Sequence, residues 1–485
     1  MLSFLIALAV LIIGYIVYGA LCSRIFGVDP SRPVPSQTRC DGVDFIPLPT
    51  WKVFLIQFLN IAGLGPIFGA IMGVMFGPAA FIWIVVGTIF GGAVHDYMSG
   101  LMSIRSGGDS LPELVGRELG PSIKQTMRVV SVVLLILVGA VFVINPADLL
   151  SGMTPDYLDR TFWIGAIFVY YILATLLPID KLIGNFYPVF GLALLFMAAG
   201  LLYVLFFGGH TIPDGFAEGV YNRRANPEAT PIFPMMFVSI ACGAISGFHA
   251  TQSPMMARCL KNEKLARPIF YGAMVAEGIV ALIWAAAAIT FVGGYDQLAQ
   301  YMAEHGGKPA MLVNEISISW LGSLGGILAL LGVIAAPITT GDTALRSARL
   351  IAADFLKFNQ KTILRRLVVS LPIFALCFGV MMIDFNVLWR YFAWVNQTLA
   401  VFTLWAITVY LARHRRAYIV SLIPAIFMTM VSVSYILFAP SPEGFGLGLT
   451  VALSCAALAA CVTLGLFIHY LKLLRSGRLV HEVGY

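Results

Sequence analysis

Asn60-Ile-Ala-Gly-Leu-Gly-Pro66 interrupts an apolar segment with two glycines and a proline, and a similar break recurs at Gly243-Ala-Ile-Ser-Gly-Phe-His-Ala-Thr-Gln-Ser-Pro254. In a bilayer every backbone N–H and C=O needs a partner inside the protein, so such breaks persist only where they line an enclosed cavity. If the first break lies in helix one of a core, the second lies in helix six. Paired breaks are typical of secondary transporters built from two inverted repeats, with the substrate between them.

The composition predicts an all-α polytopic membrane protein. Of the 485 residues 59% are hydrophobic and 11% are charged, and the mean hydropathy is +0.90. Spanning about 30 Å of hydrocarbon takes roughly 20 apolar residues. Thirteen segments meet that need, near residues 2–21, 52–75, 79–101, 126–144, 161–177, 185–207, 233–255, 268–292, 322–345, 366–383, 388–411, 417–438 and 446–470.

The distribution of Lys and Arg predicts the orientation, because cytoplasmic loops carry an excess of both. With thirteen spans, 25 of the 30 Lys and Arg residues fall in one set of loops, and the other set holds Arg160, Arg223, Arg224, Lys308 and Arg390. We therefore expect a multi-pass protein of the inner (plasma) membrane with its N-terminus outside and its C-terminus in the cytoplasm. The net charge of +6 then reflects topology and indicates no nucleic-acid partner.

The chain divides into four predicted parts. Residues 1–51 form an extra N-terminal helix, retained because no cleavage site follows it, with a cytoplasmic loop. Residues 52–232 form the first five-helix repeat, and residues 233–411 form the second, inverted one. Residues 412–485 add two helices and a cytoplasmic tail. The seven cysteines lie in predicted helices or cytoplasmic loops, so we expect no disulfide and no zinc site.

The chemistry of the breaks favours an anionic substrate. A half-helix that begins inside the membrane presents free N–H groups and about half a positive charge, which suits a small carboxylate. The alternative is that the glycines only allow close helix packing. The predicted substrate-binding residues are Asn60, Ala62, Gly63, Gly65, Gly243, Gly247, His249, Gln252 and Ser253.

Ionisable residues at membrane depth are functional candidates by default. His249 follows the second break and could bind a carboxylate or carry a proton; the alternative is a neutral imidazole bonded to a freed carbonyl. His95 and Asp96 stand near the inner end of the third predicted helix, where they would form an inner gate, or an interfacial pair without a transport role. Glu277 is expected at a helix end or in an ion pair and receives no role.

The segment Ala335–Thr343 predicts the ion-coupling site. Thr339 and Thr340 follow a proline and offer the hard oxygen ligands that Na⁺ takes, and the carboxylate of Asp342 could carry H⁺ instead. Alternatively, both hydroxyls bond back to their own helix, and Arg346 pairs with Asp342. Apart from the coupling ion we expect no cofactor and no metal. Asn396 and Gln397 are interpreted as polar contacts between helices.

These motifs resemble the carbon starvation protein CstA family, which is grouped with the amino acid-polyamine-organocation transporters of LeuT-like fold. The resemblance implies nutrient uptake during carbon starvation, a stress response, with peptides as the traditional substrate and pyruvate with protons for better-understood relatives. This chain is shorter than the larger members, and Leu64 stands where we expect a small residue, which favours a small monocarboxylate. The matching stretches are 61–66, 91–96, 246–263, 339–346 and 390–399.

Our leading hypothesis is therefore H⁺-coupled symport of a small, pyruvate-like carboxylate or of short peptides. A Na⁺-coupled symporter for amino acids or peptides is the first alternative, and a nutrient sensor acting through a partner protein is the second. A channel would need rings of like residues or a repeated filter, which the chain lacks. No hydrolytic motif supports an intramembrane enzyme. The expected partners are this small substrate and the lipid bilayer.

Overall fold

A computed structural model describes the chain except residues 43, 177–178, 218, 359–361 and 478–485. The described residues form helices and connecting segments, with no β-strand among them. Ten of these helices are long and apolar enough to cross a membrane, or eleven if the bent pair Thr50–Ile61 and Gly65–Val74 is one span. The prediction of a polytopic helical protein is thus confirmed, whereas the count of thirteen stays a prediction.

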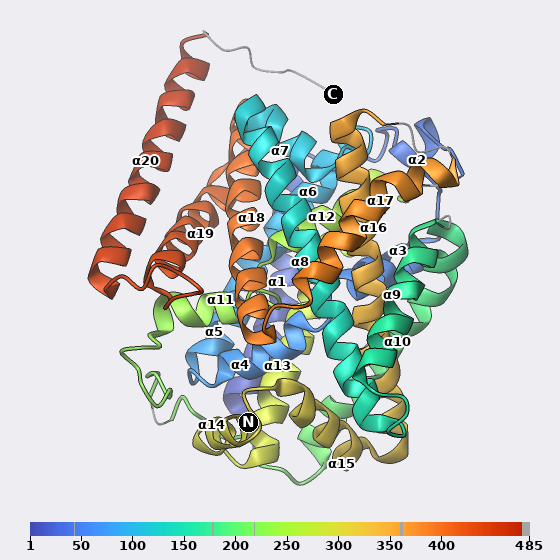
Figure 1. The fold of residues 1–485 in the computed structure, drawn as a ribbon. Helices are drawn as coiled ribbons and strands as arrows, with labels where there is room; N and C mark the ends of the chain where they lie inside the picture. The colour runs from blue at the N-terminus through green and yellow to red at the C-terminus, as the bar shows by residue number, and fades with distance from the viewer. Residues whose placement is uncertain (43, 177–178, 218, 359–361, 478–485) are drawn as a thin grey trace.

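The first half of the chain runs from a long apolar helix into the first break and on through α10 (Figure 1). Its elements are α1 (Leu2–Phe26), α2 (Pro35–Thr38), α3 (Thr50–Ile61), η1 (Gly65–Gly69), α4 (Ala70–Val74), α5 (Ala79–Val86), η2 (Gly87–Gly92), α6 (Ala93–Arg105), α7 (Leu111–Leu119), α8 (Pro121–Met153), α9 (Arg160–Leu176) and α10 (Ile179–Phe207).

The second half begins with short helices around the second break and ends with two helices at the edge of the bundle (Figure 1). Its elements are η3 (Ile232–Met236), α11 (Phe237–Ser239), α12 (Gly247–Ala257), η4 (Glu263–Leu265), η5 (Arg267–Tyr271), α13 (Gly272–Val292), α14 (Tyr295–Glu304), α15 (Pro309–Ala329), η6 (Leu330–Ala335), α16 (Ala336–Leu356), α17 (Ile363–Val380), α18 (Phe385–Arg413), α19 (Ile419–Phe438) and α20 (Leu449–Arg475).

Besides the bent pair at the first break, two predicted spans correspond to elements that are short or interrupted. The predicted span 161–177 becomes α9, whose apolar part is shorter than the other spans. The predicted span 233–255 becomes η3, α11 and α12, because its glycines and proline divide it. A separate short helix, α7, lies between two long ones and is amphipathic, with Leu111, Leu114 and Val115 buried.

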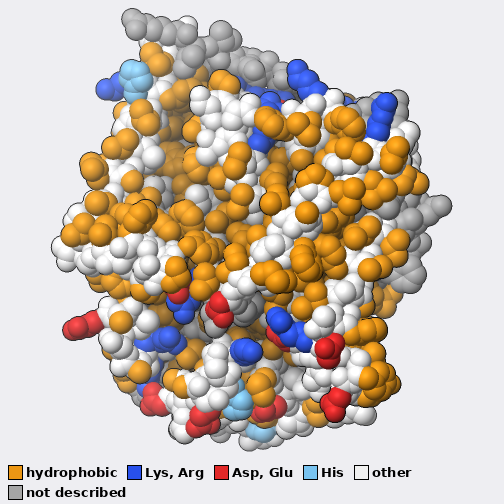
Figure 2. Space-filling view, viewed as in Figure 1, with side chains coloured by type: hydrophobic (Ala, Val, Ile, Leu, Met, Phe, Trp, Pro, Cys, Tyr) orange, Lys and Arg blue, Asp and Glu red, His pale blue; other side chains and the backbone are white. Residues whose placement is uncertain are grey.

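The broken segments lie at the centre of the bundle. Helix α12 packs against α6, α18 and α3, and α16 packs along α8. Helices α1 and α20 leave most of their apolar side chains exposed, as expected for helices that face lipid. Figure 2 shows apolar side chains across the middle of one face and charged side chains toward its two ends, the pattern of a membrane-embedded surface.

A buried carboxylate ties three distant segments together at one end of the bundle. Glu263 in η4 is fully buried and accepts hydrogen bonds from Arg32 at 2.7 Å and from Arg105 at 2.5 Å. Arg105 ends α6 and also donates to the carbonyls of Phe26 and Gly27 at 3.0 Å. The end of α1, the end of α6 and η4 are therefore held to one another.

Candidate functional site

The two breaks predicted from the sequence meet inside the bundle. Helix α3 ends at Ile61, and Ala62 leaves the helical conformation at φ −84° and ψ 41°. The chain turns helical again at Gly65, with Pro66 in the first turn, where its missing N–H costs no helical hydrogen bond. A methyl group on Gly65 would lie 2.2 Å from Cβ of Cys242 in the second break. The two breaks are therefore in direct contact.

Glycine is needed at the second break for conformation and for close approach. Gly243 has φ +90°, a region that side chains other than glycine rarely adopt. A Cβ on Gly247 would lie 2.4 Å from the carbonyl oxygen of Asn396 and 2.5 Å from the backbone nitrogen of Ala400, both in α18. The packing interpretation therefore applies to Gly65 and Gly247, and their role in substrate binding stays a prediction.

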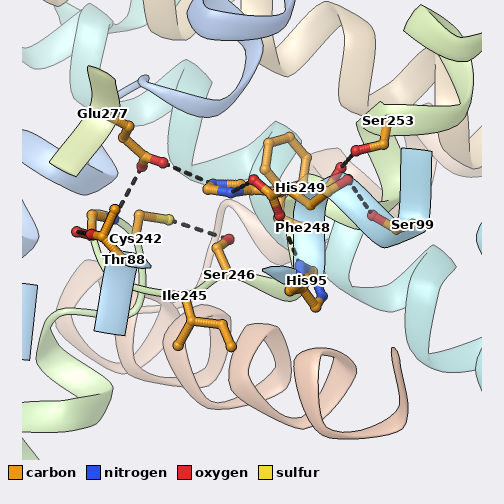
Figure 3. A network of polar contacts seen from close by, with 12 residues as sticks. Thr88, His95, Ser99, Cys242, Ile245, Ser246, Phe248, His249, Ser253 and Glu277 are labelled. Atoms are coloured by element: carbon orange, nitrogen blue, oxygen red, sulfur yellow. Dashed lines mark hydrogen bonds and ion pairs between the residues drawn. The ribbon is translucent and has the colours of Figure 1, made fainter. Parts of the chain in front are cut away.

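A chain of buried ionisable side chains joins α6, the second break and α13 (Figure 3). Oδ1 of Asp96 lies 2.8 Å from Nδ1 of His95, and Oδ2 of Asp96 lies 2.9 Å from Nδ1 of His249. On the other side of the imidazole, Nε2 of His249 lies 3.5 Å from Oε2 of Glu277. Glu277 Oε1 accepts a hydrogen bond from the N–H of Gly243 at 3.0 Å. All four ionisable side chains are fully buried.

This arrangement changes the interpretation of His95 and Asp96. Both residues belong to α6 and have no exposed surface, and the alternative of an interfacial pair without a transport role stays open. Asp96 contacts the imidazole of His249, which places the pair beside the second break. Their predicted role as an inner gate stays a prediction.

The start of α12 is held by groups from neighbouring helices. The carboxamide oxygen of Asn396 accepts from the N–H of Phe248 at 2.6 Å and from the hydroxyl of Ser246 at 3.1 Å. The hydroxyl of Thr88 donates to the carbonyl of Gly243 at 3.0 Å. Asn396 thus makes the polar helix contact predicted for it. An anion that binds this break has to replace protein groups that already use its N–H donors.

Several buried amide groups around the breaks lack part of their hydrogen bonding. Among the described residues, both polar side-chain atoms of Gln57, the Nδ2 of Asn60, the Oε1 of Gln252 and the Oε1 of Gln397 have no hydrogen-bond partner. Buried polar atoms of this kind are rare and are usually satisfied by water or a ligand. Sequence analysis did not select Gln57; its position one helical turn before Asn60 could have suggested it.

Other predicted substrate residues are bonded within their own helix. The hydroxyl of Ser253 donates to the carbonyl of His249 at 3.0 Å, and the amide of Gln252 donates to the hydroxyl of Thr251 at 3.0 Å. Leu64, Gly63 and Ala62 are buried at the first break. All nine predicted substrate-binding residues are therefore buried, and their role in binding stays a prediction.

Helix α16 brings one of the two predicted hydroxyls to the first break. Thr340 Oγ1 donates at 3.1 Å to the carbonyl of Leu59, which a continuous α3 would use for its own helical bond, and lies 3.0 Å from the carbonyl of Ala336. The hydroxyl of Thr339 donates back to the carbonyl of Ala336 at 2.7 Å, and the carbonyl of Thr339 accepts from Tyr187 at 3.2 Å. The carboxylate of Asp342 accepts from the hydroxyl of Tyr187 at 2.6 Å.

Glu277 belongs to the buried cluster around His249, although the sequence suggested no role for it. It was expected in an ion pair or at a helix end; it does face His249, and it lies in the second turn of α13. A lone carboxylate inside a 21-residue apolar helix was the signal that could have identified it.

Cys242 also lies beside this cluster. Donor atoms of Cys242, His249 and Glu277 lie within 4.8 Å of one another. The thiol of Cys242 donates to the hydroxyl of Ser246 at 3.6 Å and accepts from the amide of Asn396 at 3.7 Å. A cysteine that binds a metal ion does so as a thiolate, whereas the thiol of Cys242 acts as a hydrogen-bond donor. We therefore interpret the three residues as part of one polar cluster and not as a metal site.

Comparison with known proteins identifies relatives among membrane transporters. A family model described as carbon starvation protein CstA matches residues 1–157 and 153–320. An uncharacterized membrane protein of Haemophilus influenzae is 42% identical over 339 residues, covering 60% of this chain and 91% of that protein. The peptide transporter CstA of Bacillus subtilis is 29% identical over 346 residues, covering 58% of this chain and 57% of that protein.

The pyruvate/proton symporter BtsT of Escherichia coli is 28% identical over 349 residues, covering 57% of this chain and 47% of that protein. The chain therefore spans about half the length of the named transporters that it matches. The segment with Thr339, Thr340 and Asp342 lies outside the residues that the family model matches.

Solved structures share the fold at low identity. A mutant of the Eremococcus coleocola manganese transporter matches with a TM-score of 0.55 and 13% identity, and a complex of that transporter with an aromatic bis-isothiourea substituted compound matches with 0.51 and 12%. Each match covers 90% of this chain and 99% of the other. At this identity the likeness concerns the fold alone.

Proposed function

Because the chain belongs to the carbon starvation protein CstA family of transporters, we propose that it takes up a small, pyruvate-like carboxylate by H⁺ symport during carbon limitation. The observation that carries the proposal is the contact between the two breaks, beside the buried chain of Asp96, His249 and Glu277. Such clusters of ionisable groups inside membrane proteins mark substrate paths and proton relays.

The architecture that we propose is a LeuT-like core of two inverted five-helix repeats within thirteen spans. Support comes from the bend of 51° at the first break, from the interrupted segment that ends in α12, and from the likeness to a solved transporter. Figure 1 places the start of α1 and the end of α20 toward opposite ends of the bundle, as an odd number of spans requires. With the N-terminus outside, the Arg-rich loops face the cytoplasm.

A small monocarboxylate fits this site better than a peptide. The two breaks approach so closely that Gly65 has no room for a methyl group beside Cys242. Leu64 fills the first break with a fully buried side chain. His249 and the N–H of Gly243 supply a positive group and a donor for one carboxylate, whereas a peptide would need room for a chain as well.

Ion coupling is proposed at the contact between the first break and α16. The hydroxyl of Thr340 donates to the carbonyl of Leu59, and the hydroxyl of Thr343 donates to the amide oxygen of Asn60 at 3.3 Å. A movement of the first break would therefore alter hydrogen bonds made by α16. Asp342 is the carboxylate in this helix. We favour H⁺ over Na⁺ because a buried carboxylate such as Asp342 needs a proton or a counter-charge at membrane depth, and because the named relative BtsT is a proton symporter.

Uptake into proteoliposomes tests the proposal. We expect saturable accumulation of labelled pyruvate when the interior is made alkaline, with no requirement for Na⁺, and weaker competition by dipeptides than by lactate. Accumulation that requires a Na⁺ gradient would favour the Na⁺-coupled alternative, and uptake of labelled dipeptide without pyruvate uptake would contradict the substrate assignment. Absence of saturable uptake of both substrates would contradict transport itself.

A further inference from the structure

Glu277 occupies the place where an anion would bind the second break. One carboxylate oxygen accepts from the N–H of Gly243 at 3.0 Å, and the other faces Nε2 of His249 at 3.5 Å. These are the donor and the positive group that a substrate carboxylate would use. A substrate anion and the ionised side chain of Glu277 therefore compete for the same partners.

The hydrogen bonding around His249 requires a shared proton. Nδ1 of His249 is 2.9 Å from Oδ2 of Asp96, and because an ionised carboxylate only accepts hydrogen bonds, Nδ1 is the donor when Asp96 is ionised. Nε2 of His249 and Oε2 of Glu277 face each other at 3.5 Å, and neither atom has a hydrogen-bond partner among the described residues. Two lone pairs at this distance repel each other, so one proton lies between them, carried by either the imidazole or the carboxyl group.

The charge count shows what a second proton does. With one shared proton the carboxylates of Asp96 and Glu277 and the imidazolium of His249 sum to −1, inside a region that is fully buried. A bound anion would make the net charge of the site −2, and burying uncompensated charge is very costly. A proton on Glu277 returns the sum to −1 and weakens its hydrogen bond with the N–H of Gly243, because a neutral carboxyl group is a weaker acceptor than a carboxylate. Anion and proton then enter with no change in buried charge.

We propose that Glu277 is a proton-binding carboxylate whose protonation is required for an anion to bind at the second break. The inference rests on the proposed function and specifies how that site couples its substrate to H⁺. It assigns Glu277 a role separate from that of Asp342, which lies in α16 and contacts Tyr187. The two buried carboxylates thus lie in different helices and have different partners.

The titratable groups facing Glu277 come from three elements. Helix α6 supplies Asp96, with His95 bonded behind it. Helix α12 supplies His249, and the break itself supplies the thiol of Cys242. His249 favours the ionised form of Glu277 and Asp96 disfavours it, so occupation of the site by an anion, which acts like Asp96, shifts the balance toward the protonated form.

The experiment measures pyruvate binding to purified full-length protein by calorimetry between about pH 5 and 8, the range in which imidazole and perturbed carboxyl groups titrate. In the wild type we expect the dissociation constant to rise about tenfold per pH unit above the titration of Glu277, because one proton is bound with each anion. Glu277→Gln imitates the neutral, protonated side chain, a weaker acceptor for Gly243 than the carboxylate, and should bind pyruvate with no pH dependence. Calorimetry in buffers of different ionisation enthalpy should give one proton per pyruvate in the wild type and none in the variant.

Two further variants separate the contributions. Glu228→Gln, an exposed residue with the same chemical change, should behave as the wild type. Asp342→Asn should retain the pH dependence of binding, because Asp342 does not contact the second break. The proposal is overturned if Glu277→Gln retains the wild-type pH dependence, or if that dependence disappears in Asp342→Asn instead. Stoichiometric binding of Mn²⁺ or Zn²⁺ that Glu277→Gln abolishes would also overturn it, because a metal ion would then balance the charge.

Infrared spectroscopy keeps the inference testable apart from the substrate. A wild type that binds no pyruvate would refute the proposed substrate class, and the carboxyl band then decides the role of Glu277. We expect a band of a protonated, buried carboxyl group that grows as the pH is lowered and is missing in Glu277→Gln. A spectrum in which the substitution removes no such band at any pH would overturn the inference.

Discussion

Replacing Gly247 by alanine tests whether the start of α12 is as close to α18 as the structure indicates. The new Cβ would lie 2.4 Å from the carbonyl oxygen of Asn396, 2.5 Å from the nitrogen of Ala400 and 2.6 Å from Cβ of Leu399, whereas real Cβ contacts are essentially never shorter than 3.0 Å. The first two are backbone atoms that cannot rotate away, so α12 and α18 must separate. Overpacking of this kind costs about 1–3 kcal/mol or more.

Helix propensity acts in the opposite direction, since alanine is favoured over glycine by up to about 1 kcal/mol inside a helix. The clash is larger, so Gly247→Ala should be destabilised by about 1–2 kcal/mol. The matched control is Gly91→Ala, a buried glycine whose new Cβ would meet only the side chain of Ile245, at 3.4 Å; it should be at least as stable as the wild type.

Thermal unfolding in detergent, at one scan rate for all three proteins because membrane proteins often unfold irreversibly, measures this difference. The expected order of melting temperatures is Gly91→Ala at or above wild type, and Gly247→Ala clearly below it. If Gly247→Ala melts with Gly91→Ala, the backbone of α18 is not in contact with α12, and the packing described at the second break is wrong.

Three further predictions concern the site and its support. His249→Ala should fold and insert but lose most pyruvate uptake, because the imidazole supplies the positive group at the break; unaltered uptake with an unaltered pH profile would assign His249 a structural role. Asp342→Asn should lose accumulation against a gradient while still exchanging labelled for unlabelled pyruvate, and accumulation that survives both this change and Thr340→Ala would place coupling elsewhere. Glu263→Gln should lower the stability by about 3 kcal/mol, the lower end for breaking a buried ion pair, because Arg32 keeps some contact with solvent; a melting temperature equal to that of Glu228→Gln would show that the pair contributes little.

The position of the two breaks could be predicted from the sequence because the rule behind it is local. Glycine and proline in an apolar segment disrupt a helix wherever it lies, and a bilayer allows this only inside the protein. A LeuT-like fold would also bring Thr340 to the carbonyls freed by the first break, and Thr340 does bond the carbonyl of Leu59, although the two residues are far apart in the chain. Thr339 fits the alternative instead, since it bonds to its own helix.

The partners of the ionisable residues could not be predicted, because they depend on how separate helices rotate about their axes. Asp96 and His249 are 153 positions apart and become neighbours only when α6 packs on α12. Glu277 was visible as a carboxylate in an apolar segment, but no local pattern shows that it accepts from Gly243. Such contacts follow from packing that the periodicity of a single helix does not specify.

The most direct test of H⁺ symport is the internal pH of proteoliposomes after pyruvate is added outside, with no ion gradient imposed. The account predicts that pyruvate entering down its own gradient carries protons with it, so the interior acidifies faster than in protein-free liposomes and faster than with Glu277→Gln. Saturable entry of labelled pyruvate without any acidification beyond that of protein-free liposomes would contradict it.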